Sequence, residues 1–129
     1  MKHVSPEMLK LTLSVKPENK LILISDVIPL AHGKKGVGYF AESEITEKDG
    51  IAVKTSDSTI AGSVLFVCDM FKKLKNVFNT TFQNLVMYSS INPAKQLGIE
   101  DEYKIGIGKT PNFTVWNENS TEPVKTFIA

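Results

Sequence analysis

Apolar and polar positions in the first part of the chain follow two different patterns, which predict a helix and then a buried strand. Residues 6–15 carry apolar side chains at near-helical spacing, and Ser5 followed by Pro6 is typical of a helix start. Residues 21–24 form an unbroken apolar run that ends at Ser25 and Asp26. Because apolar residues at both alternating positions indicate burial on both faces, we expect Leu21–Asp26 to be a central parallel strand.

The pattern becomes shorter between Gly33 and Gly62, where brief apolar stretches predict strands at residues 36–40, 44–46 and 51–53. Asp49 and Gly50 lie between two of these stretches, and an Asp-Gly pair readily adopts the positive φ angles of a type I′ turn. We therefore expect a small antiparallel excursion at about residues 33–62, with a hairpin at this pair.

The second half of the chain predicts helices followed by strands. Ser63 is expected to cap a helix whose apolar face repeats at helical spacing as far as Phe78. Further helices are expected from Thr80 and across Asn92–Gly98, where an asparagine cap is followed by proline and closed by glycine. Residues 112–117 and 123–129 then predict two strands that are joined by a polar turn.

Length and composition limit both the architecture and the partners. A chain of 129 residues can form one modest domain, whereas a complete (β/α)8 barrel needs about 200 residues or more. The net charge is only +1, so no strong electrostatic field attracts nucleic acid or an anionic membrane. All 15 basic residues are lysines, and without arginine the chain cannot grip a phosphate or a carboxylate through a bidentate pair.

The sequence shows no segment that would direct the chain to a membrane. Its start is polar and lacks the apolar region of a signal peptide, and no apolar run approaches the ~20 residues of a membrane span. We therefore expect a cytoplasmic protein that has neither a nucleic-acid partner nor a membrane partner.

The residue types that most often bind metals are scarce. His3 and His32 are the only histidines, Cys68 is the only cysteine, and none of them shows a familiar metal-ligand spacing. Since a zinc centre needs about three or four ligands, this chain alone is not expected to form one. Cys68 lies on the apolar face of a predicted helix and is expected to be a small core residue in a reducing compartment.

Two segments allow both a functional and a purely structural interpretation. Asp26 follows a predicted parallel strand, where ligands and catalytic groups gather in α/β proteins, but an aspartate also suits the turn before Pro29. Ile60–Ser63 leads into a predicted helix N-terminus whose free N–H groups could meet an anion. Tight packing and a serine cap explain that segment equally well.

Five short motifs occur in an order and spacing that resemble one enzyme family. They are His3–Glu7, Leu23–Asp26, Ile60–Ser63, Asn92–Gly98 and Ile105–Lys109. Together they resemble the C-terminal third of the N-acetylglucosamine-6-phosphate deacetylase family, part of the amidohydrolase superfamily. The resemblance implies an α/β fold, with the C-terminal part of a (β/α)8 barrel at residues 1–108 and strands of a small β-sandwich at residues 109–129. Leu21–Asp26 would then be the last barrel strand.

The resemblance also implies roles for individual residues. Asp26 matches the family's catalytic aspartate, which activates a metal-bound water and later protonates the leaving amine. His3 matches a histidine that contacts the sugar phosphate, and Ile60, Ala61 and Gly62 match a backbone segment that touches the substrate. The family's metal ligands, a glutamate and two histidines, have no counterpart in this chain, so the zinc or iron of a complete enzyme would be bound elsewhere.

Three functions are compatible with the sequence. The first is the C-terminal piece of a metal-dependent deacetylase that converts N-acetylglucosamine 6-phosphate into glucosamine 6-phosphate and acetate. Such a piece would be inactive alone, would need an N-terminal complementing polypeptide, and is expected to be a homo-oligomer. The second is a non-catalytic sugar-phosphate-binding or interaction module. The third is an independent α+β domain that shares only the architecture of the family.

Overall fold

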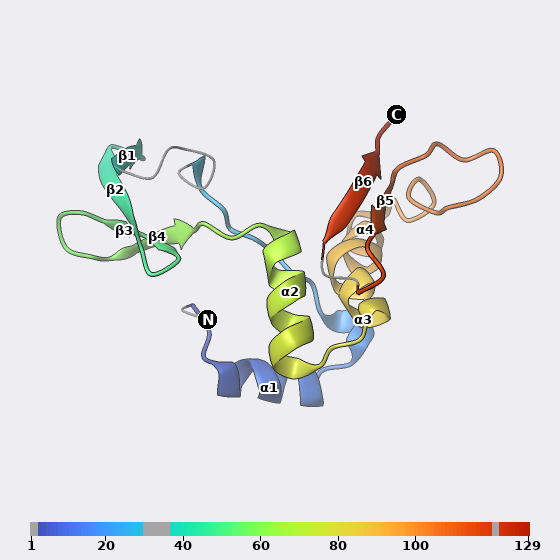
Figure 1. Cartoon of the computed structure of the whole chain (residues 1–129), viewed down its shortest axis with the longest axis horizontal. Coiled ribbons are helices and arrows are strands. Elements are labelled where there is room, and N and C mark those ends of the chain that lie inside the picture. The colour runs from blue at the N-terminus through green and yellow to red at the C-terminus, as the bar shows by residue number, and fades with distance from the viewer. Residues whose placement is uncertain (1–2, 30–36, 120–121) are drawn as a thin grey trace. The chain divides into compact units, whose positions relative to one another are not determined.

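The structure is a computed structural model that describes residues 3–29, 37–119 and 122–129 (Figure 1). The chain divides into two compact units. One contains residues 3–23 and the chain from residue 68 onward, and the other contains residues 24–67. The α-helices and strands of the chain, in order, are α1 Pro6–Val15, β1 Val37–Phe40, β2 Ser43–Lys48, β3 Ile51–Lys54, β4 Ile60–Ser63, α2 Val67–Phe78, α3 Phe82–Val86, α4 Asn92–Leu97, β5 Phe113–Trp116 and β6 Pro123–Phe127.

The unit formed by residues 24–67 is built around a four-stranded antiparallel sheet with the strand order β1-β2-β3-β4. The predicted hairpin is confirmed between β2 and β3, because Asp49 and Gly50 have φ angles of 54° and 78°. The small core of this sheet unit consists of Ile28, Ile45 and Ala52, with partly buried apolar neighbours against them. The antiparallel excursion is therefore confirmed over its described residues, while residues 33–36 lie outside them.

The predicted helix start at Ser63 is wrong. Ile60–Ser63 forms strand β4, and helix α2 begins only at Val67. The hydroxyl oxygen of Ser63 accepts a hydrogen bond from the Leu65 N–H at 3.0 Å, which is a local turn contact. The backbone of β4 instead pairs with β3, and Ser63 forms a parallel bridge with Val27. Strand pairing therefore outweighs the local capping signal.

The predicted strand at Leu21–Asp26 is also not formed. The segment has no strand pairing in the described residues until Val27, which makes a single parallel bridge to Ser63. Ile22 is 41% exposed and Ile24 is 74% exposed, so burial on both faces is not observed. A parallel strand needs hydrogen-bonding neighbours along its length, and the described residues supply them only at this end.

The unit that contains residues 3–23 and the chain from residue 68 onward is called the helical unit, and it begins as the sequence predicts. Helix α1 spans Pro6–Val15, and the Ser5 hydroxyl oxygen accepts a hydrogen bond from the Met8 N–H at 3.3 Å. None of the residues of α1 is buried. Cys68, expected in the core, is a half-buried free thiol near the start of α2.

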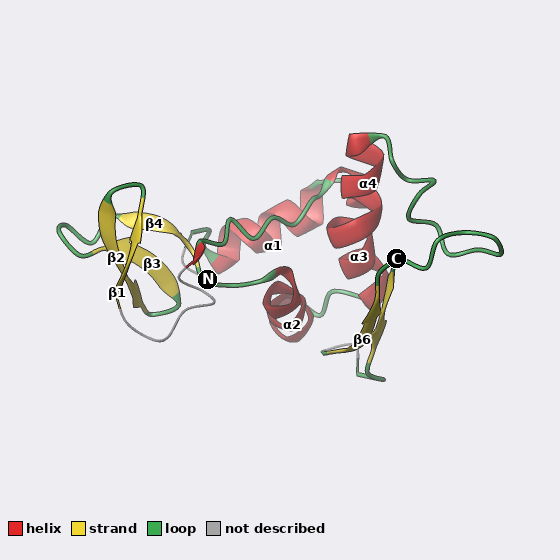
Figure 2. Cartoon of the chain, turned by 90° about the horizontal axis from the view of Figure 1, so that it is seen from above, coloured by secondary structure: helices red, strands yellow, loops and turns green. Residues whose placement is uncertain are grey.

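Helices α3 and α4 are joined by a π-helical turn, Met87–Ile91, and form one nearly continuous helical segment (Figure 2). Thr81 caps α3, and Gly98 ends α4 with a φ angle of 70°, so both predicted boundaries are confirmed. The predicted asparagine cap is wrong, because the helix continues through Asn92 from the preceding turn.

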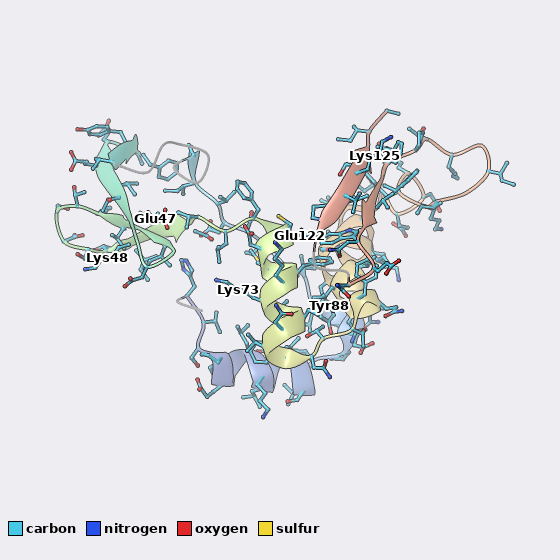
Figure 3. The ribbon with its side chains drawn as sticks, in the orientation of Figure 1. Glu47, Lys48, Lys73, Tyr88, Glu122 and Lys125 are labelled. Atoms are coloured by element: carbon cyan, nitrogen blue, oxygen red, sulfur yellow. The ribbon has the colours of Figure 1, made fainter. Side chains whose placement is uncertain are left out.

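The Asn92 side chain ties α4 to an earlier part of the chain. Its Nδ2 donates to the carbonyl oxygens of Glu18 and Leu21, at 2.8 and 2.7 Å. The Leu23 N–H donates to the carbonyl oxygen of Tyr88 at 3.0 Å, and Tyr88, which Figure 3 labels, belongs to the same helical segment as Asn92. Burial, with a smaller contribution from the Glu18 charge, raises the pKa of the Tyr88 hydroxyl. The segment before Ile24 is thus held by the helical unit.

The two strands predicted for the tail are confirmed, and they form the antiparallel pair β5–β6. Trp116 of β5 stacks on Phe71 of α2 with ring centroids 4.6 Å apart, and Phe82 of α3 meets both rings edge-on. At the surface, Lys72 pairs with Glu122 at 2.8 Å, and Figure 3 labels Glu122. These contacts attach the tail to the helices of its own unit.

Candidate functional site

Asp26 has an unusual backbone conformation. Its φ angle is 48°, in the left-handed region that few non-glycine residues occupy, although aspartate tolerates it better than most. Its carbonyl oxygen accepts a hydrogen bond from the Ser63 N–H at 3.0 Å, and two residues later the Ile28 N–H donates to the Ser63 carbonyl oxygen at 3.0 Å. Asp26 itself is exposed, so its carboxylate is accessible to solvent.

Gly62 lies where β4 approaches Asp26 and Ile28. Its φ angle is 146°, which L-residues with a side chain rarely adopt. A Cβ atom at this position would lie 2.6 Å from Ile28 Cγ2 and 3.4 Å from the Asp26 carbonyl oxygen. Glycine is therefore required at residue 62 by both the backbone conformation and the close approach.

Strand β4 contains a β-bulge at the same place. Ile60 pairs with Val53 and Gly62 pairs with Ala52, so Ala61 is the extra residue in the ladder. Bulges are common beside active sites, where they redirect a segment of backbone. Ile60 is 48% exposed, Ala61 is partly buried and Gly62 is buried.

The structure brings together four of the five residues predicted for the site. One unit contains Asp26, Ile60, Ala61 and Gly62. The backbone of Ser63, the residue after Gly62 in β4, makes the hydrogen bond that links this strand to Asp26. His3 belongs to the other unit, where it is exposed and precedes the start of α1.

The part of the chain that the structure describes contains no group of three or more His, Cys, Asp or Glu residues that could hold a metal ion. A zinc site needs about three or four protein ligands, more than any such group among the described residues supplies. The described residues therefore do not fit a metal centre by themselves. His32 lies outside the described residues.

Ser63 is the residue of the site that the sequence pattern misassigned. Its backbone, rather than its hydroxyl group, makes the two hydrogen bonds to Asp26 and Ile28. The signal that could have identified it is the preceding Gly62, because a glycine in a strand often marks a bulge or a close backbone approach.

Known proteins provide an independent comparison. No protein-family model matches the chain. A curated N-acetylglucosamine-6-phosphate deacetylase from Bacillus subtilis (strain 168) is 32% identical over 114 residues, which cover 88% of this chain and 28% of the relative. Among the described residues, no helix is long and apolar enough to cross a membrane.

Solved structures agree with that comparison. The N-acetylglucosamine-6-phosphate deacetylase of Thermotoga maritima matches with a TM-score of 0.81 and 28% identity, over 98% of this chain and 37% of that one. The Pasteurella multocida deacetylase matches with a TM-score of 0.86 and 20% identity, over 98% of this chain and 33% of that one, which supports the fold alone. A mutant of the Mycobacterium smegmatis deacetylase, solved in complex with N-acetyl-D-glucosamine-6-phosphate, matches with a TM-score of 0.67 and 22% identity. This match covers 76% of this chain and 27% of that one, and it also supports the fold alone.

The chain spans about a third of the length of these proteins. The resemblance inferred from the five sequence motifs is confirmed, because the curated and the structural relatives carry the same enzyme name. The chain is therefore similar to a partial, C-terminal portion of N-acetylglucosamine-6-phosphate deacetylase.

Proposed function

We propose that this chain is the C-terminal portion of a metal-dependent N-acetylglucosamine-6-phosphate deacetylase, and that it supplies the catalytic carboxylate of Asp26. The complete enzyme would hydrolyse the N-acetyl group and release glucosamine 6-phosphate and acetate. The observation that carries the proposal is the hydrogen-bonded pairing of Asp26 with the strand Ile60–Ser63, within a chain that matches deacetylases over most of its length.

The geometry of Asp26 suits proton transfer. Its carboxylate is exposed, whereas its carbonyl oxygen and the Ile28 N–H, two residues later, are both hydrogen-bonded to the backbone of Ser63 in β4. A single carboxylate can take a proton from the attacking water and later return that proton to the leaving amine. The chemistry of amide hydrolysis requires both transfers, so one fixed aspartate can serve both steps.

The neighbouring residues would bind the sugar. Ile60, Ala61 and Gly62 would present backbone groups to the substrate, since the bulge at Ala61 interrupts the regular ladder there. His3 would contact the phosphate, which a chain without arginine can hold only through histidine, lysine or backbone N–H groups.

The remaining parts of the enzyme would come from outside this chain. The divalent metal, zinc or iron, would be bound by a portion that the chain does not span, such as an N-terminal complementing polypeptide. We further propose that the complete enzyme is a homo-oligomer and that it works in the cytoplasm. Residues 1–108 would form the last part of a (β/α)8 barrel, and residues 109–129 would add strands to a small β-sandwich. Leu21–Asp26, which forms no strand in this structure, would become the final barrel strand only when neighbouring strands from outside this chain pair with it.

Complementation tests this function directly. The chain is co-expressed with the unmatched N-terminal part of the Bacillus subtilis deacetylase, and acetate release from N-acetylglucosamine 6-phosphate is measured with added Zn²⁺ or Fe²⁺. The pair should be active, whereas Asp26→Asn should lose activity by a factor near the upper end of the ~10²–10⁴ range that is typical of general acid–base groups.

Two controls make the result interpretable. Copurification shows whether the Asp26→Asn chain still assembles with its partner, as this nearly isosteric change should allow. The chain alone should release no acetate, and turnover without the partner would contradict the proposal. Activity of the Asp26→Asn pair within a few-fold of the parent would show that Asp26 is not the catalytic carboxylate.

A further inference from the structure

The conformation of Asp26 needs external support. A φ angle of 48° lies in a region that L-residues populate sparsely, and such residues persist where the surrounding structure fixes them. The Cα–Cβ bond of Asp26 is set by the same backbone that carries its carbonyl group, so a shift of that carbonyl group or a rotation beside it would redirect the side chain. The direction of the Asp26 carboxylate therefore depends on whatever holds its backbone.

Strand β4 provides that support. The Ser63 N–H holds the Asp26 carbonyl oxygen and the Ser63 carbonyl oxygen holds the Ile28 N–H, both at 3.0 Å. Ser63 is in turn paired with Ile51 and Gly62 with Ala52, so the sheet fixes the residues that fix Asp26. Ser63 is 6% exposed, which shields these bonds from competing water.

The approach of the two segments depends on the missing side chain of Gly62. An added Cβ would lie 2.6 Å from Ile28 Cγ2, a distance that real Cβ contacts do not show, and 3.4 Å from the Asp26 carbonyl oxygen. Any side chain at residue 62 would push Ile28 away and stretch the bonds between Ser63 and the segment that contains Asp26.

We propose that Gly62 is a positioning residue for Asp26: its lack of a side chain lets Ser63 hold the Asp26 backbone in the left-handed conformation that directs the carboxylate. This inference rests on the proposed catalytic role of Asp26. It adds a second role to Gly62, which the family resemblance treats only as a backbone contact to the substrate.

Hydrogen exchange of the full chain, read by mass spectrometry at single-residue resolution, tests the structural half of the inference. In Gly62→Ala, the Ser63 and Ile28 amides should exchange about 10- to 100-fold faster, the range expected when one methyl group overpacks a site. Gly50→Ala is the matched control, because Gly50 also has a positive φ angle but has open space around its Cβ position. It should loosen the hairpin and leave these two amides unchanged.

A second variant keeps the test decisive if Gly62→Ala folds poorly. Leucine has no Cγ2 branch at its Cβ and nearly the volume of isoleucine, so Ile28→Leu removes the atom that the added methyl group would meet. The pair Gly62→Ala/Ile28→Leu should recover the part of the Ser63 amide's protection that the contact with Cγ2 removes, while the strain of an alanine at a φ angle of 146° remains. Unchanged protection in Gly62→Ala alone, or equal losses in Gly50→Ala, would overturn the inference.

A double-mutant comparison in the complemented enzyme tests the functional half. Gly62→Ala should lower kcat by about 10- to 100-fold with a much smaller change in KM, as misplacement of a catalytic group does. In the Asp26→Asn background it should cause no further loss of kcat. An equal loss in both backgrounds, or a change confined to KM, would overturn the positioning role and leave the proposed function intact. Full activity of Asp26→Asn alone would instead overturn the proposed function.

Discussion

The two units of this chain hold their parts together by different means. In the helical unit, side chains make the long-range connections: Trp116 stacks on Phe71, and the Asn92 amide group reaches two carbonyl oxygens far away in the sequence. In the sheet unit, backbone groups make them, through the strand ladder and the bonds between Ser63 and Asp26. The helical unit is therefore sensitive to the loss of side chains that connect distant residues. The sheet unit depends on its small apolar core and is also sensitive to side chains that are added where backbones meet.

The largest effect should come from the small core of the sheet unit. Ile45 is 1% exposed, and Ile45→Ala should lower the free energy of unfolding by about 2–5 kcal/mol, because few neighbours can close the cavity. Amide exchange should increase first in β2 and β3. Val37→Ala, at a side chain that is 58% exposed, is the control and should stay within about 0.5 kcal/mol. Equal losses for the two variants would show that Ile45 is not a core residue.

The next effect belongs to the side-chain connection in the helical unit. Asn92→Ala removes the donor for the Glu18 and Leu21 carbonyl oxygens and should cost about 1–3 kcal/mol in denaturant unfolding. Asn84→Ala removes only an exposed hydrogen bond to the Glu18 carboxylate, so it should cost about 0.5 kcal/mol or less. A smaller loss for Asn92→Ala than for Asn84→Ala would contradict this account of Asn92.

The extended segment Leu21–Asp26 should promote association of the purified chain with other copies of itself. Ile22 and Ile24 are exposed, and the backbone of this segment forms no strand. An exposed apolar segment of this kind tends to pair with the backbone of another chain. We expect the purified chain to show a concentration-dependent mass by light scattering. Ile24→Lys should shift association to several-fold higher concentration, whereas Ile128→Lys, at another exposed isoleucine, should not. A monodisperse monomer would contradict both this prediction and the proposed barrel arrangement.

The smallest effect should come from the surface pair of Lys72 and Glu122. The hydrogen bond from Lys72 and its charge hold the pKa of Glu122 below its ordinary value. The pair therefore adds stability above about pH 5, and this contribution is lost as the carboxylate is protonated below about pH 4. Glu122→Gln should lower the melting temperature slightly at pH 7 and leave it unchanged at pH 3. A larger effect at pH 3 than at pH 7 would contradict the pairing.

The elements that the sequence predicted correctly depend on local signals. Ser5 and Thr81 cap helices through bonds to residues three positions ahead, and Asp49-Gly50 forms its turn through the positive φ angles of both residues. Gly98 likewise ends α4 by its own conformation. Such features depend on neighbours in the sequence, so a pattern of a few residues is enough to predict them.

The incorrect predictions concern residues whose partners are distant. Ile60–Ser63 looks like a helix start, but pairing with β3 makes it a strand, and Asn92 looks like a cap but reaches residues more than 70 positions earlier. Sequence position alone left the role of Asp26 open. The structure adds its pairing with β4, which no local pattern contains, while its catalytic role stays a prediction from the family resemblance.

The sequence around Asn92 has one more consequence, for chemical ageing. Asparagine usually deamidates when the backbone nitrogen of the next residue attacks its side-chain carbonyl carbon. The next residue here is Pro93, whose nitrogen carries no hydrogen and cannot take part in that attack. Conversion to aspartate would place a carboxylate against the two carbonyl oxygens that the amide group now holds. The proline that follows Asn92 thus preserves, over the lifetime of the protein, the connection that only an amide can make.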